Sequence, residues 1–246
     1  TNIRRKEILL IKGIKYSFYM IFARLKGLKY EHIKKTKGIE EATEYAAKSI
    51  YLWSKFTINI IGMNIKVVGK ENIPKDACVF VGNHTSILDI PVIFYSADRH
   101  IGFISKKEVL KVPVLSYWLE RGKCIALDRQ NPRDGVRMIN EGVKNLKEGY
   151  SMMIFPEGTR SLDGKTLPFK KGSMKLAIKA KAPIVPVTID SSFTSFEKNN
   201  KFKPSTVIVT FHKAIETANI TKDEEKDLAE NVRNIIISSL RDEYKN

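Results

Sequence analysis

Residues 79–89 read VFVGNHTSILD, and this stretch decides the fold. It opens with a β-branched and aromatic run that is typical of a buried strand. Gly82-Asn83 then predicts a turn. A helix is expected next, either with Ser86 and Asp89 as a capping box, or with Asp89 as the cap and Pro91 in the first turn. A strand that passes through a turn into a helix indicates an α/β domain.

The same pattern continues along the chain, where short β-rich runs alternate with helical stretches. The runs lie near 65–69, 77–81, 101–105, 123–127, 151–155, 184–189 and 206–211. Helices are expected from Asn131-Pro132, over about 172–180, and from Thr221, where Glu224 completes a capping box. We therefore predict an α/β fold with a largely parallel or mixed central sheet of about seven strands flanked by helices.

The first 62 residues have a different pattern, that of two amphipathic helices. Residues 8–25 and 39–61 are predicted to be helical, and large apolar side chains mark one face of the first. That stripe consists of Leu10, Ile14, Phe18, Ile21 and Leu25. The apolar end of the second helix is shorter than the roughly 20 residues that a membrane span needs, and Lys55 interrupts it. We predict a membrane-interface motif over 1–62 and an α/β domain over 63–246.

Positive charge is concentrated in the same segment. The net charge is +16, and residues 1–37 hold eleven Lys and Arg against Glu7 and Glu31, a surplus of nine. A basic border around an apolar stripe favours a helix that lies in a membrane interface. The alternative is a helix packed on the protein's own core with its lysines in water. No recognised nucleic-acid motif accompanies the charge, so an anionic membrane lipid surface is the expected partner and nucleic acid is not.

His84 and Asp89 form a candidate proton relay. Histidine exchanges protons near neutral pH, and a carboxylate on its other ring nitrogen fixes the tautomer. Positions five apart on one helix point about 140° away from each other, so the two side chains meet only if His84 precedes the helix that carries Asp89. The alternative is a simple helix cap beside a polar turn residue.

Cationic residues follow later strand-like runs. Lys106 and Arg129 each follow such a run, and Phe155–Arg160 reads FPEGTR after another. Arg160 presents a fork of donors that fits phosphate, and cations at strand ends can converge on one crevice. The alternatives are solvated charges and a surface salt bridge from Glu157 to Arg160. The four histidines show no metal-ligand spacing, so no metal is expected.

In this order the blocks resemble those of the lysophospholipid and glycerolipid acyltransferases. Asn83-His84 with Asp89 is similar to the first family motif, and the run ending at Arg129 is similar to the second. Residues 155–160 match the third, and Ile184–Val187, with its Pro186, looks like the fourth. The resemblance covers roughly 60–215. The short chain with two preceding amphipathic helices is most similar to the bacterial 1-acylglycerol-3-phosphate type.

The resemblance implies transfer of a fatty acyl group from a thioester to the sn-2 hydroxyl of lysophosphatidic acid, which gives phosphatidic acid. It makes His84 the general base and Asp89 its orienting carboxylate. The acceptor phosphate is then held by Lys106, Arg129 and Arg160. The substrate loop comprises Asn83, Glu157, Gly158 and Thr159. No cofactor is implied beyond the co-substrate, acyl-CoA or acyl carrier protein.

The sequence is compatible with several alternatives. Ser86 raises a Ser–His covalent route beside direct attack by the acceptor hydroxyl. The acceptor is alternatively glycerol 3-phosphate or another lysophospholipid. A third alternative, from another functional class, is a membrane lipid-binding protein without turnover. Such a protein has no evident need of a general base. The expected location is the cell membrane, peripheral or monotopic on its cytoplasmic face.

Overall fold

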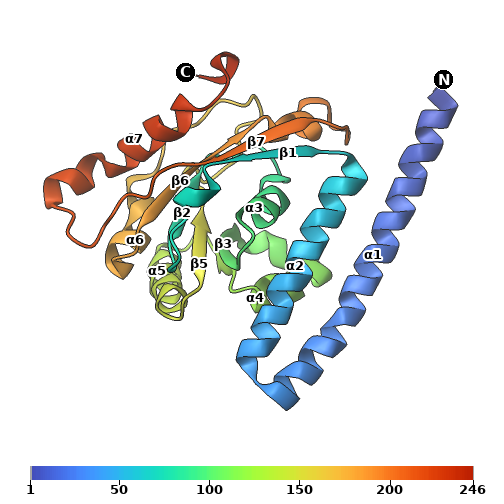
Figure 1. Cartoon of the computed structure of the whole chain (residues 1–246), viewed down its shortest axis with the longest axis horizontal. Coiled ribbons are helices and arrows are strands. Elements are labelled where there is room, and N and C mark those ends of the chain that lie inside the picture. Colours follow the sequence, from blue (N-terminus) through green and yellow to red (C-terminus); the bar gives the residue numbers. More distant parts are fainter. Residues whose placement is uncertain (1, 246) are drawn as a thin grey trace.

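A seven-stranded mixed sheet forms the centre of the molecule, as predicted (Figure 1). The computed structural model describes residues 2–245, without the side chains of residues 2–6, 8, 9 and 132. The strands are β1 (Asn64–Val68), β2 (Val79–Gly82), β3 (Ile101–Lys106), β4 (Ile125–Leu127), β5 (Ser151–Ile154), β6 (Ile184–Asp190) and β7 (Thr206–Phe211). Their order is β1-β7-β6-β2-β5-β3-β4, and each pair is parallel except β6–β7.

The helices cover both faces of this sheet. They are α1 (Asn2–Lys37), α2 (Ile39–Ile61), α3 (Asp89–Ala97), α4 (Pro113–Arg121), α5 (Pro132–Lys147), α6 (Lys175–Ala180) and α7 (Lys222–Ser238). The first helix is longer at both ends than the predicted 8–25, whereas the second has the predicted bounds. The stretch predicted over 172–180 begins with a 3-10 turn, Lys171–Met174, before α6. Thr221 and Glu224 form the expected capping box at the start of α7.

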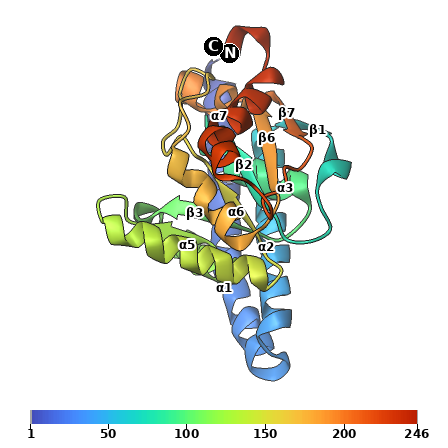
Figure 2. The same ribbon diagram turned by 90° about the vertical axis from the view of Figure 1, so that its left-hand side faces the viewer.

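Alternation along the strands divides the core in two. Phe80 packs into a cluster with residues of α2, α3 and α4, while its neighbours Val79 and Val81 pack with α5, α6 and α7. Successive side chains of a strand point to opposite faces, so β2 contributes to both clusters. The views in Figures 1 and 2 show the two helical layers on either side of the sheet.

The first two helices form an antiparallel pair against one layer. Trp118 on α4 donates from Nε1 to the Ala23 carbonyl oxygen at 3.1 Å, and the Tyr117 hydroxyl donates to that of Gly27 at 3.0 Å. A Cβ at Gly27 would lie 2.8 Å from the Tyr117 ring, so glycine permits this close approach. The buried side of α2 belongs to the core of the sheet. Residues on the two sides of the predicted boundary at 62–63 therefore share one core.

The outer face of α1 remains uncovered. The five residues of the predicted apolar stripe are all exposed, Phe18 by 70%. This contradicts the alternative in which the stripe packs on the protein's own core. Within residues 2–245, none of the helices combines the length and the apolar character needed to cross a bilayer.

Parallel pairing sets the position of the candidate site. Because β2, β5, β3 and β4 are parallel neighbours, the segments that follow them emerge at one edge of the sheet. The turn containing His84 follows β2, and the loop after Ile154 follows β5. Lys106 is the last residue of β3, and the loop containing Arg129 follows β4. This edge is where ligands bind in open α/β sheets.

Candidate active site

His84 and Asp89 meet in the geometry that their spacing required. His84 lies in the turn after β2, and Asp89 is the first residue of α3. The His84 Nδ1 atom lies 2.8 Å from Asp89 Oδ2, and the carboxylate is completely buried. The same oxygen accepts the backbone N–H groups of Thr85 at 2.8 Å and Ser86 at 2.9 Å. The turn thus bends back to surround the carboxylate.

The predicted capping roles were wrong. Leu88 is the cap residue of α3 and makes no side-chain capping bond. Only half of the Ser86–Asp89 capping box forms, because the Ser86 hydroxyl accepts from the N–H of Leu88 and not from that of Asp89. The Asp89 carboxylate is directed back into the turn, where His84 is one of its partners. The simple-cap alternative is therefore incorrect.

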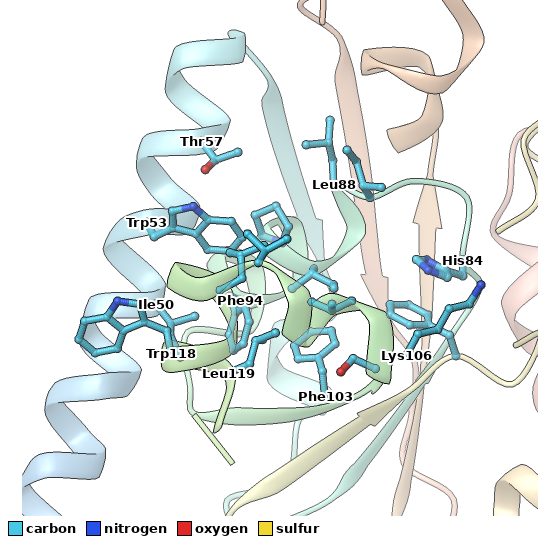
Figure 3. Close-up of a pocket in the computed structure, with 18 of the residues that line it drawn as sticks. Ile50, Trp53, Thr57, His84, Leu88, Phe94, Phe103, Lys106, Trp118 and Leu119 are labelled. Carbon is cyan, nitrogen blue, oxygen red and sulfur yellow. The ribbon is translucent and has the colours of Figure 1, made fainter. Parts of the chain in front are cut away.

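The His84 ring is held flat against Phe155. The ring centroids are 4.2 Å apart with an interplanar angle of 13°, so the rings stack. With Nδ1 bonded to Asp89, Nε2 is the nitrogen left for another partner. The side chain is 19% exposed and lines a large cavity (Figure 3). His84 is therefore oriented, partly shielded from solvent, and accessible to a bound molecule.

Ser192 completes the surroundings of the Asp89 carboxylate. It lies just after β6, and its hydroxyl donates to Asp89 Oδ1. Its oxygen is also 2.9 Å from the Thr85 hydroxyl oxygen. Sequence reasoning missed Ser192, because a serine after a strand has no local signature. Only the pairing of β6 with β2 brings it to the turn.

Glu157 ties the loop after β5 to the turn after β2. Its carboxylate accepts the backbone N–H of His84 at 2.6 Å and that of Leu167 at 2.9 Å. Burial raises the pKa of Glu157 to about 7, against the opposing effect of these two hydrogen bonds. The alternative interpretation, a surface salt bridge from Glu157 to Arg160, is therefore wrong. Arg160 pairs instead with Glu197, 2.9 Å from Nη1 to Oε1.

Asn83 extends the β2–β6 ladder with its side chain. Its amide donates to the carbonyl oxygen of Ile189 at 2.9 Å and accepts the Ile189 N–H at 2.8 Å. The residue is fully buried and does not line the cavity. Its contacts are thus those of a structural residue that fixes where the His84 turn begins.

We expect Asn83→Ala to lower the free energy of unfolding by about 2–5 kcal/mol, because two buried backbone groups of Ile189 lose their partners. Urea denaturation measures this change. An unchanged midpoint combined with weaker acceptor use would instead place Asn83 in the substrate loop.

The three predicted cations meet at one end of the cavity, which has a volume of about 1030 Å³. Lys106, Arg129 and Arg160 all line it, together with Gly158 and Thr159. Arg129 also donates from Nη1 to the Gly158 carbonyl oxygen. Lys170 is a further cation in this lining that was not among the predicted phosphate-binding residues. Glu157, like Asn83, is not among the residues that line the cavity.

The other end of the cavity is lined mainly by apolar and aromatic side chains, with Lys12 and Lys26 of α1 also in the lining. It extends between α1, α2, α3 and α4, and Figure 3 shows its labelled residues of α2, α3 and α4 on the side away from His84 and Lys106. Its labelled lining side chains are Ile50, Trp53, Thr57, Leu88, Phe94, Phe103, Trp118 and Leu119. The cavity therefore has the polarity of a lipid with a charged head, and His84 lies beside the charged end.

The Ser86 hydroxyl is engaged elsewhere. It donates to Glu197 Oε2 at 2.7 Å and accepts the N–H of Leu88 at 3.0 Å. These bonds leave it outside the His84–Asp89 relay. In the described part of the chain, no cluster of three or more His, Cys, Asp or Glu side chains is arranged to hold a metal ion.

The fold and the site together define an α/β protein with a carboxylate-oriented histidine beside a cavity that is cationic at one end and apolar at the other. A family model described as Acyltransferase matches residues 64–190. The chain belongs to the acyltransferase family.

Named relatives agree with this membership. A Saccharomyces cerevisiae 1-acyl-sn-glycerol-3-phosphate acyltransferase is 34% identical over 187 residues, 74% of this chain and 62% of the relative. One from Borreliella burgdorferi is 32% identical over 188 residues, 76% and 75% of the two chains. The crystal structure of the 1-acyl-sn-glycerophosphate (LPA) acyltransferase PlsC from Thermotoga maritima is 30% identical, with a TM-score of 0.81. That match covers 96% of this chain and 94% of the other. This chain thus spans less than two thirds of the yeast relative and nearly all of the bacterial structure.

Proposed function

We propose that this protein transfers a fatty acyl group from an acyl thioester to the sn-2 hydroxyl of 1-acyl-sn-glycerol 3-phosphate and so makes phosphatidic acid. The observation that carries the proposal is the His84–Asp89 pair, 2.8 Å apart, at the cationic end of a cavity with an apolar arm. The names of the relatives support the acceptor.

In the proposed reaction the acceptor hydroxyl gives its proton to His84 Nε2 as its oxygen attacks the thioester carbonyl carbon. Asp89 offsets the positive charge that the ring gains. When the tetrahedral intermediate collapses, the carbon–sulfur bond breaks and His84 returns the proton to the leaving thiolate. Such acid–base catalysis typically contributes about 10²–10⁴-fold. Because Ser86 is bonded to Glu197 and Leu88, direct attack is favoured over an acyl-serine.

The cationic end of the cavity is suited to the acceptor's phosphate. Lys106, Arg129 and Arg160 would hold it, with Lys170 beside them, and so place the hydroxyl near His84. The apolar arm offers a compartment for an acyl chain. The acyl donor, coenzyme A or acyl carrier protein, is a co-substrate, and no cofactor is part of the proposal.

A purified-protein assay that crosses two acceptors with two donors tests the proposal. We expect turnover with 1-acylglycerol 3-phosphate and either oleoyl-CoA or oleoyl acyl carrier protein. Turnover with glycerol 3-phosphate but not with 1-acylglycerol 3-phosphate would make glycerol 3-phosphate the acceptor in place of the proposed one. Binding of lysophosphatidic acid without turnover of any pair would favour a non-catalytic lipid-binding protein.

We also propose that α1 contacts an anionic membrane surface, which makes the protein peripheral or monotopic on the cytoplasmic face of the cell membrane. The exposed apolar stripe and the basic residues of the same helix support this placement.

Replacing Leu10, Phe18 and Leu28 with serine should reduce binding to vesicles that contain phosphatidylglycerol at least tenfold, because three exposed apolar side chains lose their lipid contact. Sedimentation with vesicles at low and high salt measures this, and the basic residues should add a salt-dependent part. Equal binding of the triple variant would move the membrane contact away from α1.

A further inference from the structure

Glu197 is a buried carboxylate that contacts two of the family blocks without belonging to either. It lies in the β6–β7 connection, in the 3-10 turn Glu197–Asn199, beyond residue 190 where the family match ends. Its side chain is only 5% exposed. Oε1 accepts from Arg160 Nη1 at 2.9 Å and from the Ile87 N–H at 2.8 Å, and Oε2 accepts from the Ser86 hydroxyl at 2.7 Å.

Each of these three donors belongs to a part of the site. Arg160 lines the cationic end of the cavity, and its side chain is 37% exposed. Ser86 and Ile87 lie in the turn whose N–H groups surround Asp89. One carboxylate therefore fixes one edge of the arginine fork and at the same time holds the turn that carries the proton relay.

The burial of Glu197 favours keeping its ion pair with Arg160 intact. Arg160 forms a salt bridge with Glu197. Burying a carboxylate away from water costs free energy unless the carboxylate is paired with a cation and hydrogen-bonded. The guanidinium is planar, so fixing Nη1 also fixes the direction of its other donors. The position of Glu197 thus determines which way Arg160 can present itself to a ligand.

We propose that Glu197 is a positioning residue that aims Arg160 at the phosphate of the acceptor and sets the distance between that phosphate and His84. This inference rests on the proposed function. A purely structural anchor in the β6–β7 connection is the competing interpretation.

Glu197→Gln separates the two. Glutamine keeps the size and one acceptor oxygen, and the Ser86 hydroxyl can rotate to accept from the new amide, while the charge on Arg160 loses its partner. We expect the acceptor KM to rise about tenfold, since the ion pair between Arg160 and Glu197 becomes a hydrogen bond from the guanidinium to an uncharged amide oxygen. The KM of the acyl donor should change less than threefold. An anchor without a positioning role would change thermal stability and leave the acceptor KM at its wild-type value.

The matched control is Glu148→Gln, because Glu148 Oε2 accepts from Lys123 Nζ at the same 2.9 Å but lies away from the cavity. It should leave both KM values unchanged.

A double-variant cycle with Arg160→Ala shows whether Glu197 acts through that arginine. In the Arg160→Ala background, Glu197→Gln should change acceptor binding less than twofold. Equilibrium binding of 1-acylglycerol 3-phosphate without donor gives the same quantity where turnover is too slow. A second tenfold loss of acceptor affinity in that background, or equal effects of Glu197→Gln on donor and acceptor KM, would overturn the positioning role of Glu197. The proposed function would be unaffected by either result. An Arg160→Ala variant with unchanged acceptor binding would instead overturn the phosphate role on which it rests.

Discussion

His84→Ala should lower the rate of acyl transfer to lysophosphatidic acid by about 10²–10⁴-fold, the contribution typical of a positioned acid–base group. The fold should persist, because Asp89 keeps the N–H groups of Thr85 and Ser86 and the hydroxyl of Ser192. Initial rates at saturating substrates and thermal melting by circular dichroism measure the two effects.

His32→Ala is the matched control, since His32 is exposed on α1 and outside the cavity lining. It should retain wild-type activity. A folded His84→Ala protein with a rate near that of the wild type would refute the proposed mechanism. A loss of structure in the same variant would assign His84 to the fold, where its ring stacks on Phe155.

Arg160→Ala should raise the acceptor KM by about 10²-fold and affect the donor KM far less, because truncating one partner of a hydrogen-bonded charge pair typically costs 2–5 kcal/mol. Steady-state kinetics with each substrate varied in turn measures the split. The variant also leaves Glu197 buried without its cation, so its thermal stability should fall.

Adding Glu197→Gln to Arg160→Ala should restore part of that stability without restoring acceptor affinity. Uniform losses for donor and acceptor would indicate general damage and not a lost phosphate contact.

Most of the fold was predictable because its determinants are local. Seven β-rich runs became seven strands, and the helix over 39–61 has its predicted bounds. The sequence reading did not delimit α3 and α4. The segment Asp89–Ala97 is buried on most sides, so its apolar residues show no clear helical period. The first helix extends beyond 8–25 because its ends are polar but still compatible with helix.

Site residues were predictable from the sequence only where their chemical type and their position after a strand-like run indicate a function. His84, Asp89 and the three cations follow strand ends, and parallel pairing brings them together. Ser192 and Glu197 reach the turn through the contact of β6 with β2, which a single sequence does not show. Proximity in sequence also suggested the wrong partner for Arg160. Glu157 is three residues away but is already occupied by two backbone N–H groups.

The pairing of β1 with β7 has a consequence for the order of assembly. Among the described residues, Asn64–Val68 pair with no strand other than Thr206–Phe211, which is the last of the seven along the chain. Such long-range pairing makes folding slow, and during synthesis one edge of the sheet must wait until β7 has left the ribosome. The α1 helix precedes all seven strands along the chain, so its apolar stripe can form before β7 is synthesised. With α1 at a bilayer, as proposed above, the growing chain would be held at the membrane before the sheet is complete.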